Sequence, residues 1–114
     1  MSNLYDAAYE FEDQIRQSAE FKALTKAYNQ LKTDDEAFDE FKKLQKMQIE
    51  FGKKQVSGKV EQQDLDALTQ EGKKASSYKA LLELEEKEQT LAKIIDEVHG
   101  IMFKPVEELY TAKD

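Results

Sequence analysis

Apolar residues recur along the chain at steps of three and four, the spacing that places side chains on one face of an α-helix. A first set runs from Leu4 to Ile15 and a second from Phe21 to Leu31, with a shift of phase between them. Ser18 lies at this shift and is a residue type that caps the N-terminus of a helix. The pattern predicts two helices, or one kinked helix, over residues 4–31.

A third apolar stripe begins within the segment TDDEAF, at Phe38, and belongs to a helix expected to run to about Gln55. Its members are Phe38, Phe41, Leu44, Met47 and Phe51. Thr33 and Glu36 have the spacing of a capping box, and Asp34 is a competing cap. The segment GKKQVSGKVEQQ contains two glycines and lacks apolar periodicity after Val56, so we predict a loop there. A shorter helix is expected next, with Leu65 and Leu68 on its apolar face.

The longest stripe lies in a helix expected from Tyr78 to Phe103, after the serines of ASS, which we expect to cap it. Pro105 should kink this helix or begin a short terminal one. The stripe follows the heptad pattern of helices that pack at a shallow angle. Its positions are Leu81, Leu84, Leu91, Ile95, Val98 and Met102. We interpret this seam as a candidate for the core of the fold, for the contact with a second copy, or for both.

Glu88 interrupts the seam at a position where the pattern calls for an apolar residue. A carboxylate buried without a partner is costly. Glu88 should therefore lie where the seam opens to solvent, or it should meet a lysine from another helix. We favour solvent exposure because glutamate is rarely buried without a partner.

Composition supports the helical interpretation. Hydrophobic residues make up 39% and charged residues 36% of the chain, as in long amphipathic helices with one wet face. Four glycines and one proline supply few turns, which argues against an all-β fold. We predict a single all-α domain over residues 1–114. It should be an antiparallel bundle of about four to five helices with a long C-terminal helix, and we favour a dimer.

The candidates for chemistry are weak. The chain has no cysteine, which excludes disulfides, thiolate metal sites and cysteine nucleophiles. His99 is the only histidine, and Asp96 three residues earlier gives it one possible partner, which is too little for a metal site or a catalytic set. Glycine-rich phosphate loops are absent as well. We therefore expect no enzymatic activity, no cofactor and no metal.

The charge pattern bears on partners. A net charge of −7 opposes binding to duplex nucleic acid. A strip of lysines nevertheless follows the acidic start of the third helix: Lys42, Lys43, Lys46, Lys53, Lys54 and Lys59. Acidic residues at a helix start and basic residues toward its end complement the helix dipole. The alternative is a basic strip that docks on an acidic partner or on RNA.

The location of the protein follows from what the sequence does not contain. The start, MSNLYDAAYEFED, has no basic region followed by an apolar run, so it does not resemble a secretory signal. No stretch approaches the ~18 apolar residues of a membrane span. We expect a cytoplasmic protein without a membrane partner.

Three segments and the long last helix carry a family resemblance. The segments are LYDAAYEFEDQIRQSAEFKAL, DDEAFDEFKKLQKMQ and KKQVSGK. The chain resembles the YlbF/YmcA family of small helical proteins from Gram-positive bacteria, and most closely its YheA-like, largely uncharacterised branch. The resemblance implies an all-α bundle, dimeric or larger, that acts through protein contacts. Better-known relatives influence competence, sporulation, biofilm formation and mRNA processing through ribonuclease Y. The cysteines that serve iron–sulfur cluster binding in some relatives have no counterpart here.

Two hypotheses follow. The first is a non-enzymatic cytoplasmic regulatory or interaction protein that acts through helical contacts and forms a homo-oligomer. The second is an RNA-processing accessory protein that uses the Lys42–Lys59 strip to contact RNA or a ribonuclease complex.

Overall fold

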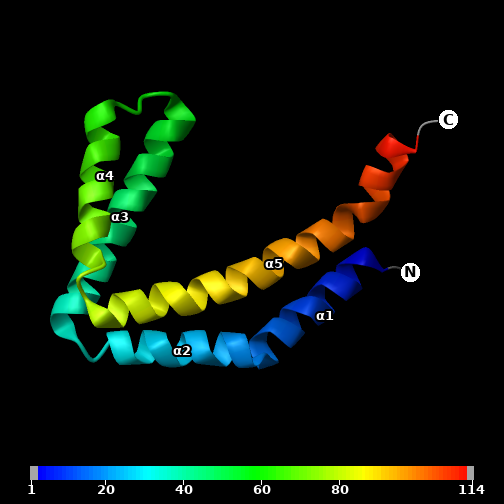
Figure 1. Cartoon of the computed structure of the whole chain (residues 1–114), viewed down its shortest axis with the longest axis horizontal. Helices are drawn as coiled ribbons and strands as arrows, with labels where there is room; N and C mark the ends of the chain where they lie inside the picture. Colours follow the sequence, from blue (N-terminus) through cyan, green and yellow to red (C-terminus); the bar gives the residue numbers. More distant parts are fainter. Residues whose placement is uncertain (1–2, 113–114) are drawn as a thin grey trace.

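The computed structural model describes residues 3–112, and the elements in this range are five helices. They are α1 (Leu4–Gln17), α2 (Ala19–Leu31), α3 (Asp35–Ser57), α4 (Gln62–Ala75) and α5 (Lys79–Thr111). Together they form an open V (Figure 1). The α3–α4 hairpin is one arm, and α2 packed along the first part of α5 is the other. The all-α prediction with a long C-terminal helix is confirmed.

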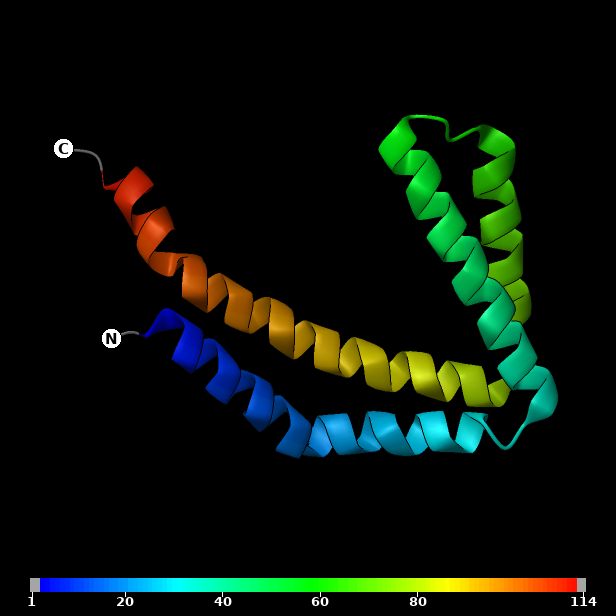
Figure 2. The same cartoon turned by 180° about the vertical axis from the view of Figure 1, so that it is seen from behind.

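The second arm continues into α1 and the end of α5, which lie far from the loop of the hairpin (Figure 2). We call this distal part, α1 together with the C-terminal end of α5, the far arm. The whole chain spans 55 × 37 × 23 Å. The two arms meet at an elbow formed by the end of α2, the start of α3, the end of α4 and the start of α5.

The phase shift between the first two apolar sets is a true helix boundary. Ser18 has an extended backbone, and its Oγ accepts a hydrogen bond of 3.1 Å from the backbone N–H of Phe21. This is the cap that the sequence predicts at the start of α2.

The cap of α3 is Asp34, whose Oδ1 accepts a hydrogen bond of 3.1 Å from the backbone N–H of Ala37. Thr33 instead donates its hydroxyl to the carbonyl of Gln30, at 2.7 Å. The predicted Thr33–Glu36 capping box is therefore wrong, and the competing candidate, Asp34, caps α3. The Thr33 hydroxyl is used to close the preceding helix.

Most of the predicted loop GKKQVSGKVEQQ is helical, because α3 continues through Gly52 to Ser57. The helix ends at Gly58, whose φ of 71° is the left-handed conformation that favours glycine. The N–H of Lys59 then bonds to the carbonyl of Lys54 at 2.9 Å, which closes the last turn. The N–H of Glu61 donates a hydrogen bond of 3.0 Å to Asp64 Oδ2, and this bond starts α4 soon afterwards.

The serines of ASS do not cap the long helix. Ser76 and Ser77 donate their hydroxyls to the carbonyls of Lys73 and Lys74, each at 2.7 Å, and so close α4. Tyr78 precedes α5 without a side-chain cap. Pro105 lies inside α5, which runs on to Thr111, and Figure 1 shows the helix bending toward its C-terminal end. Proline has no N–H for the ladder and favours such a kink.

The core lies at the elbow. Leu31 of α2 is fully buried there, beside Ala37 of α3 and Ala75 of α4. Ala27 of α2 and Leu81 and Leu84 of α5 complete the cluster. The rings of Tyr28, Phe38 and Phe41 pack around it, with centroids 6.0–6.2 Å apart. Phe38 and Phe41, the first two residues of the third apolar stripe, therefore lie at the elbow beside the end of α2.

The fold leaves much of its surface open. Its accessible surface is 9200 Å², whereas a compact monomer of this mass exposes about 6,400 Å². Its radius of gyration is 18.6 Å, against about 13 Å for a compact chain of this length. Within residues 3–112, no helix is both long and apolar enough to cross a membrane.

Candidate functional site

The predicted seam of α5 divides into a covered half and an open half. Leu81, Leu84 and Leu91 are buried, and Val98 is half-buried. Ile95 is 39% exposed and Met102 is 60% exposed. The buried residues of the seam therefore contribute to the internal core, and the exposed ones are available for contact with a second copy.

Beyond Leu84 this division follows from two neighbouring seven-residue repeats, whereas Leu81 is buried where α5 starts at the elbow. Leu84, Leu91 and Val98 lie on the side of α5 that packs on α2. Glu88, Ile95 and Met102 form the adjacent repeat and are exposed. Glu88 thus lies on the open side, as the sequence analysis favours, and among the described residues no cation lies within 4 Å of its carboxylate.

A concave surface opens on the inner side of the elbow, and we call it the elbow groove. Its volume is about 370 Å³. The floor is apolar, and amide and carboxylate side chains stand at its rim. Its lining includes Leu44 and Gln48 of α3, Leu68 of α4, and Leu81, Leu84 and Glu88 of α5.

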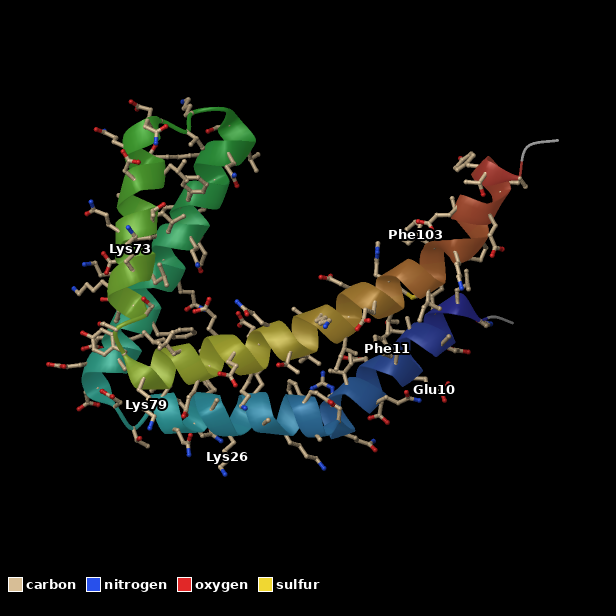
Figure 3. The ribbon with its side chains drawn as sticks, in the orientation of Figure 1. Glu10, Phe11, Lys26, Lys73, Lys79 and Phe103 are labelled. Carbon is tan, nitrogen blue, oxygen red and sulfur yellow. The ribbon has the colours of Figure 1, made fainter. Side chains whose placement is uncertain are left out.

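A second open surface lies on the C-terminal end of α5, and we call it the tail surface. It consists of large apolar side chains that are between 43% and 81% exposed. They are Ile101, Met102, Phe103, Val106, Leu109 and Tyr110. Phe103 also packs against the imidazole of His99, with ring centroids 4.6 Å apart and the ring planes tilted by 40°. Figure 3 places Phe103 near the bend of α5.

The far arm exposes apolar residues of α1 as well. Leu4, Tyr5 and Tyr9 are all more than two-thirds exposed. Phe11, by contrast, is half-buried and points from α1 toward α5, whereas Glu10 lies on the outer side (Figure 3). Much of the far arm therefore presents apolar side chains to solvent.

Half of the lysine strip is engaged within the chain. Lys54 Nζ lies 2.7 Å from Asp64 Oδ1, and Lys43 Nζ lies 3.5 Å from Glu71 Oε1. Lys42 lies 3.6 Å from Asp39 and over the ring of Phe38. These contacts join α3 to α4 or stay within α3. The other three, Lys46, Lys53 and Lys59, have no carboxylate within 4 Å among the described residues.

The sequence analysis missed a carboxyl pair between α3 and α4. The side chain of Glu40 is only 4% exposed, and that of Glu71 is 13% exposed. The two carboxyls lie close enough to affect each other's pKa through a side-chain hydrogen bond, and the buried Oε2 atom of each has no hydrogen-bond partner among the described residues. Lys74 Nζ approaches Glu40 Oε1 at 3.5 Å, while Lys43 serves Glu71.

The environment of this pair separates the two pKa values. Burial raises the pKa of the Glu40 carboxyl, and the hydrogen bond and charge of Glu71 add to the rise against the opposing effect of Lys74. The hydrogen bond from Glu40 lowers the pKa of Glu71, helped by Lys43. Below the raised pKa of Glu40, this arrangement favours one proton shared by the two carboxyls, held mainly by Glu40.

One signal in the sequence could have pointed to this pair. Glu40 stands on the apolar face of α3, three residues after Ala37 and four before Leu44. Glu71 likewise follows Leu68 by three residues and precedes Ala75 by four. Carboxylates at such positions on two consecutive helices can meet when the helices form a hairpin.

His99 does not gather a ligand set. Within residues 3–112, no group of three or more His, Cys, Asp or Glu side chains is arranged to hold a metal ion. The strongest described contact of His99 is the one with Phe103.

Comparison with known proteins decides the family. The model of the family described as control of competence regulator ComK, YlbF/YmcA, matches residues 4–107. The chain belongs to the YlbF/YmcA family. The resemblance noted in the sequence is thereby confirmed.

Individual members of the family are similar along almost their full length. A UPF0342 protein of Ligilactobacillus salivarius is 34% identical over 110 residues, covering 96% of each chain. One from Lysinibacillus sphaericus is 38% identical over 117 residues, again covering 96% of each. Among solved structures, a protein of unknown function (DUF964) from Bacillus stearothermophilus superposes with a TM-score of 0.84 at 28% identity, covering 97% of this chain and 98% of that one.

Proposed function

We propose that this YlbF/YmcA-family protein is a non-enzymatic regulatory protein that acts through helical protein–protein contacts, beginning with a second copy of itself. The observation that carries the proposal is the tail surface. Six large apolar side chains stand exposed between residues 101 and 110. Contiguous apolar patches on a protein surface mark contact sites.

The area available supports this proposal. The chain exposes about 2,800 Å² more than a compact monomer of its mass. A stable protein–protein interface takes about 800 Å² from each partner. The open V can therefore bury about 800 Å² in an interface and still expose more surface than a compact monomer of the same mass.

The family description supports a regulatory role. It links the family to control of the competence regulator ComK. The relatives compared above carry names that state no enzymatic activity. A small helical protein with a large apolar contact surface suits regulation by association, in which binding to a partner protein changes the activity of that partner.

The lysine strip gives less support to the RNA hypothesis. Three of its six lysines are paired with carboxylates of the same chain, so their charge is partly used in joining or stabilising α3 and α4. Contacts to nucleic acid backbones require cations that are free to replace counterions. RNA binding through this strip is therefore the less supported function.

The proposal is tested by the mass of the protein in solution, measured by size-exclusion chromatography with light scattering over a range of concentrations. Met102→Asp adds a carboxylate to the tail surface, and Thr90→Asp adds one to an exposed position elsewhere on α5. We expect twice the chain mass for the parent and for Thr90→Asp. Met102→Asp should shift to the mass of one chain while keeping its helical circular dichroism.

Two results would count against the proposal. The first is a parent protein that has the mass of a single chain at every concentration. The second is salt-sensitive binding of generic single-stranded RNA that disappears when Lys46, Lys53 and Lys59 are changed to glutamine. The second result would favour the RNA-processing alternative, because phosphate contacts weaken steeply with salt.

A further inference from the structure

We infer that the elbow groove of one copy receives the tail surface of a second copy, so that each chain inserts the end of its α5 into the elbow of the other. This inference rests on the self-association proposed above. It adds which two surfaces meet and in what orientation.

The two surfaces complement each other in shape and polarity. The elbow groove is concave, with an apolar floor formed by residues such as Leu44, Leu68 and Leu81. The tail surface is a helix that offers Met102, Val106 and Leu109, all exposed. Their spacing of i, i+4 and i+7 is the set of anchors that an amphipathic helix uses when it lies in an apolar groove.

A reciprocal arrangement satisfies the symmetry of a dimer. In a two-fold interface the same pair of surfaces is used twice, with the partners exchanged. If Val106 of one copy meets Leu84 of the other, the two α5 helices run antiparallel and Ile95 lies midway between these contacts. Each contact then lies about 16 Å along α5 from the two-fold axis. Ile95 is exposed on the same side as Glu88 and Met102, as this arrangement requires.

Charge favours the same docking. The far arm that carries the tail surface also carries α1, with Asp6, Glu10, Glu12 and Asp13 against the single cation Arg16, which is already paired with Glu12. The hairpin arm carries Lys46 and Lys53, which lack a carboxylate partner among the described residues, near the exposed Ile49 and Val56 of α3. The groove itself carries the carboxylates Glu85 and Glu88 and, among its described lining residues, no cation. In the docked arrangement Lys46 and Lys53, outside the groove, can face the acidic α1 of the second copy, and complementarity of this kind fixes orientation and speeds association.

The tip of the α3–α4 hairpin of a second copy is the alternative occupant of the elbow groove. The tip of the α3–α4 hairpin exposes Val56 and Val60 and carries Lys53 and Lys59. The tail surface is the better occupant because Met102, Val106 and Leu109 lie on one face of a helix over consecutive turns, whereas the tip offers two valines near a loop. The two occupants predict different pairs of neighbours across the interface.

Disulfide trapping tests the inference cleanly because the chain has no cysteine of its own. Gln48→Cys places a thiol at the elbow groove, and Val106→Cys places one on the tail surface. The two single variants are purified separately, one with an affinity tag, mixed until their subunits exchange, and oxidised mildly. Lys26→Cys replaces Val106→Cys in the control, because Lys26 lies on the outer side of α2 (Figure 3).

We expect Gln48→Cys to form a mixed disulfide with Val106→Cys at least ten times faster than with Lys26→Cys. Ile95→Cys alone should form a covalent dimer, because its two thiols meet near the symmetry axis. Leu109→Cys provides a second tail position if the variant at Val106 fails to fold.

The failures can be told apart. A parent protein with the mass of one chain defeats the self-association itself. A dimeric parent in which Gln48→Cys links to the tail variants no faster than to Lys26→Cys leaves self-association standing and overturns this inference. Preferential linkage of Gln48→Cys to Val56→Cys also overturns it and assigns the groove to the hairpin tip.

Discussion

Replacement of Glu40 by glutamine tests the electrostatics of the α3–α4 hairpin most sharply. Glu40 is buried and is coupled to the carboxyl of Glu71, and the buried Oε2 atom of each has no hydrogen-bond partner among the described residues. A proton on one carboxyl gives the pair a donor. In Glu40→Gln an amide N–H can donate permanently to Glu71, in a side chain of the same shape and without a charge to bury.

The sign of the effect depends on pH. Because the pKa of Glu40 is raised on folding, the favourable protonated form is fully present below the ordinary value of 4.5, and its contribution is lost as pH rises through the raised pKa. Each unit by which the pKa is raised costs about 1.4 kcal/mol of stability once the group is ionised at neutral pH. The glutamine variant escapes this cost. It gives up the pairing with Lys74, which is worth little because that lysine is largely exposed.

The opposite carboxyl works in the other direction. The lowered pKa of Glu71 gives a contribution that is present above 4.5 and is lost as pH falls through the lowered pKa. Glu71 retains this behaviour in Glu40→Gln because the amide N–H supports its ionised form. The difference between variant and parent therefore reports Glu40, with Lys43 and Lys74 unchanged beside the pair.

We expect Glu40→Gln to be more stable than the parent at pH 7 by about 1 kcal/mol, the net value of a typical buried hydrogen bond made without an ionisation cost. The advantage should shrink toward zero near pH 4.5. Urea unfolding followed by circular dichroism at several pH values, at one fixed protein concentration, measures it. Glu83→Gln, at an exposed position of α5, is the matched control and should track the parent. A Glu40→Gln variant that is less stable than the parent by a constant amount at every pH would refute proton sharing.

Three further predictions concern stability. Leu31 is the one large side chain that is fully buried in the described core. Leu31→Ala leaves a cavity there and should lower the free energy of unfolding, measured by urea titration, by about 2–5 kcal/mol. Gly58→Ala should lower the free energy of unfolding by about 1 kcal/mol because φ is positive at this position. Gly52→Ala lies inside α3 with open space for the added methyl group, and it should raise the melting temperature because alanine favours a helix over glycine by about 1 kcal/mol. Equal effects of the two substitutions would contradict these backbone conformations. Leu91→Asp should abolish cooperative unfolding by placing a charge in the buried seam, whereas Ile95→Asp should keep the helical signal and lose only the dimer mass.

The helices were largely predictable because their signals are local. The apolar steps of three and four locate α1, α2 and the central parts of α3 and α5, and Ser18 marks a boundary that the structure has. Cap assignments were less predictable because several residues near a helix end can make the same hydrogen bond. Thr33 and Asp34 are adjacent, and only the backbone path decides that Asp34 reaches the N–H of Ala37.

Misplaced boundaries have a similar cause. Glycine at position 52 suggests a loop, yet the surrounding helix formers and the strong stop at Gly58 carry α3 through it. Ser76 and Ser77 have the residue type of an N-cap, but the same hydroxyls can serve the helix before them. A short linker between two helices gives both uses to the same residues.

The angle between the arms was beyond reach of the sequence pattern. Periodicity shows that Leu91 and Ile95 belong to one apolar stripe, but it does not show that α2 covers the first and leaves the second open. The Glu40–Glu71 pair depends likewise on the hairpin between α3 and α4, which brings distant positions together. Contacts of this kind follow from tertiary packing, so local spacing carries little information about them.

Amide hydrogen exchange across residues 101–110 tests most directly whether a partner covers the open end of α5. We predict exchange in this segment that slows as protein concentration rises, in step with slowing at the elbow residues around Gln48, because one copy's tail protects the other copy's groove and is itself protected. Exchange in both segments that stays fast and unchanged from dilute to concentrated solution would contradict the account.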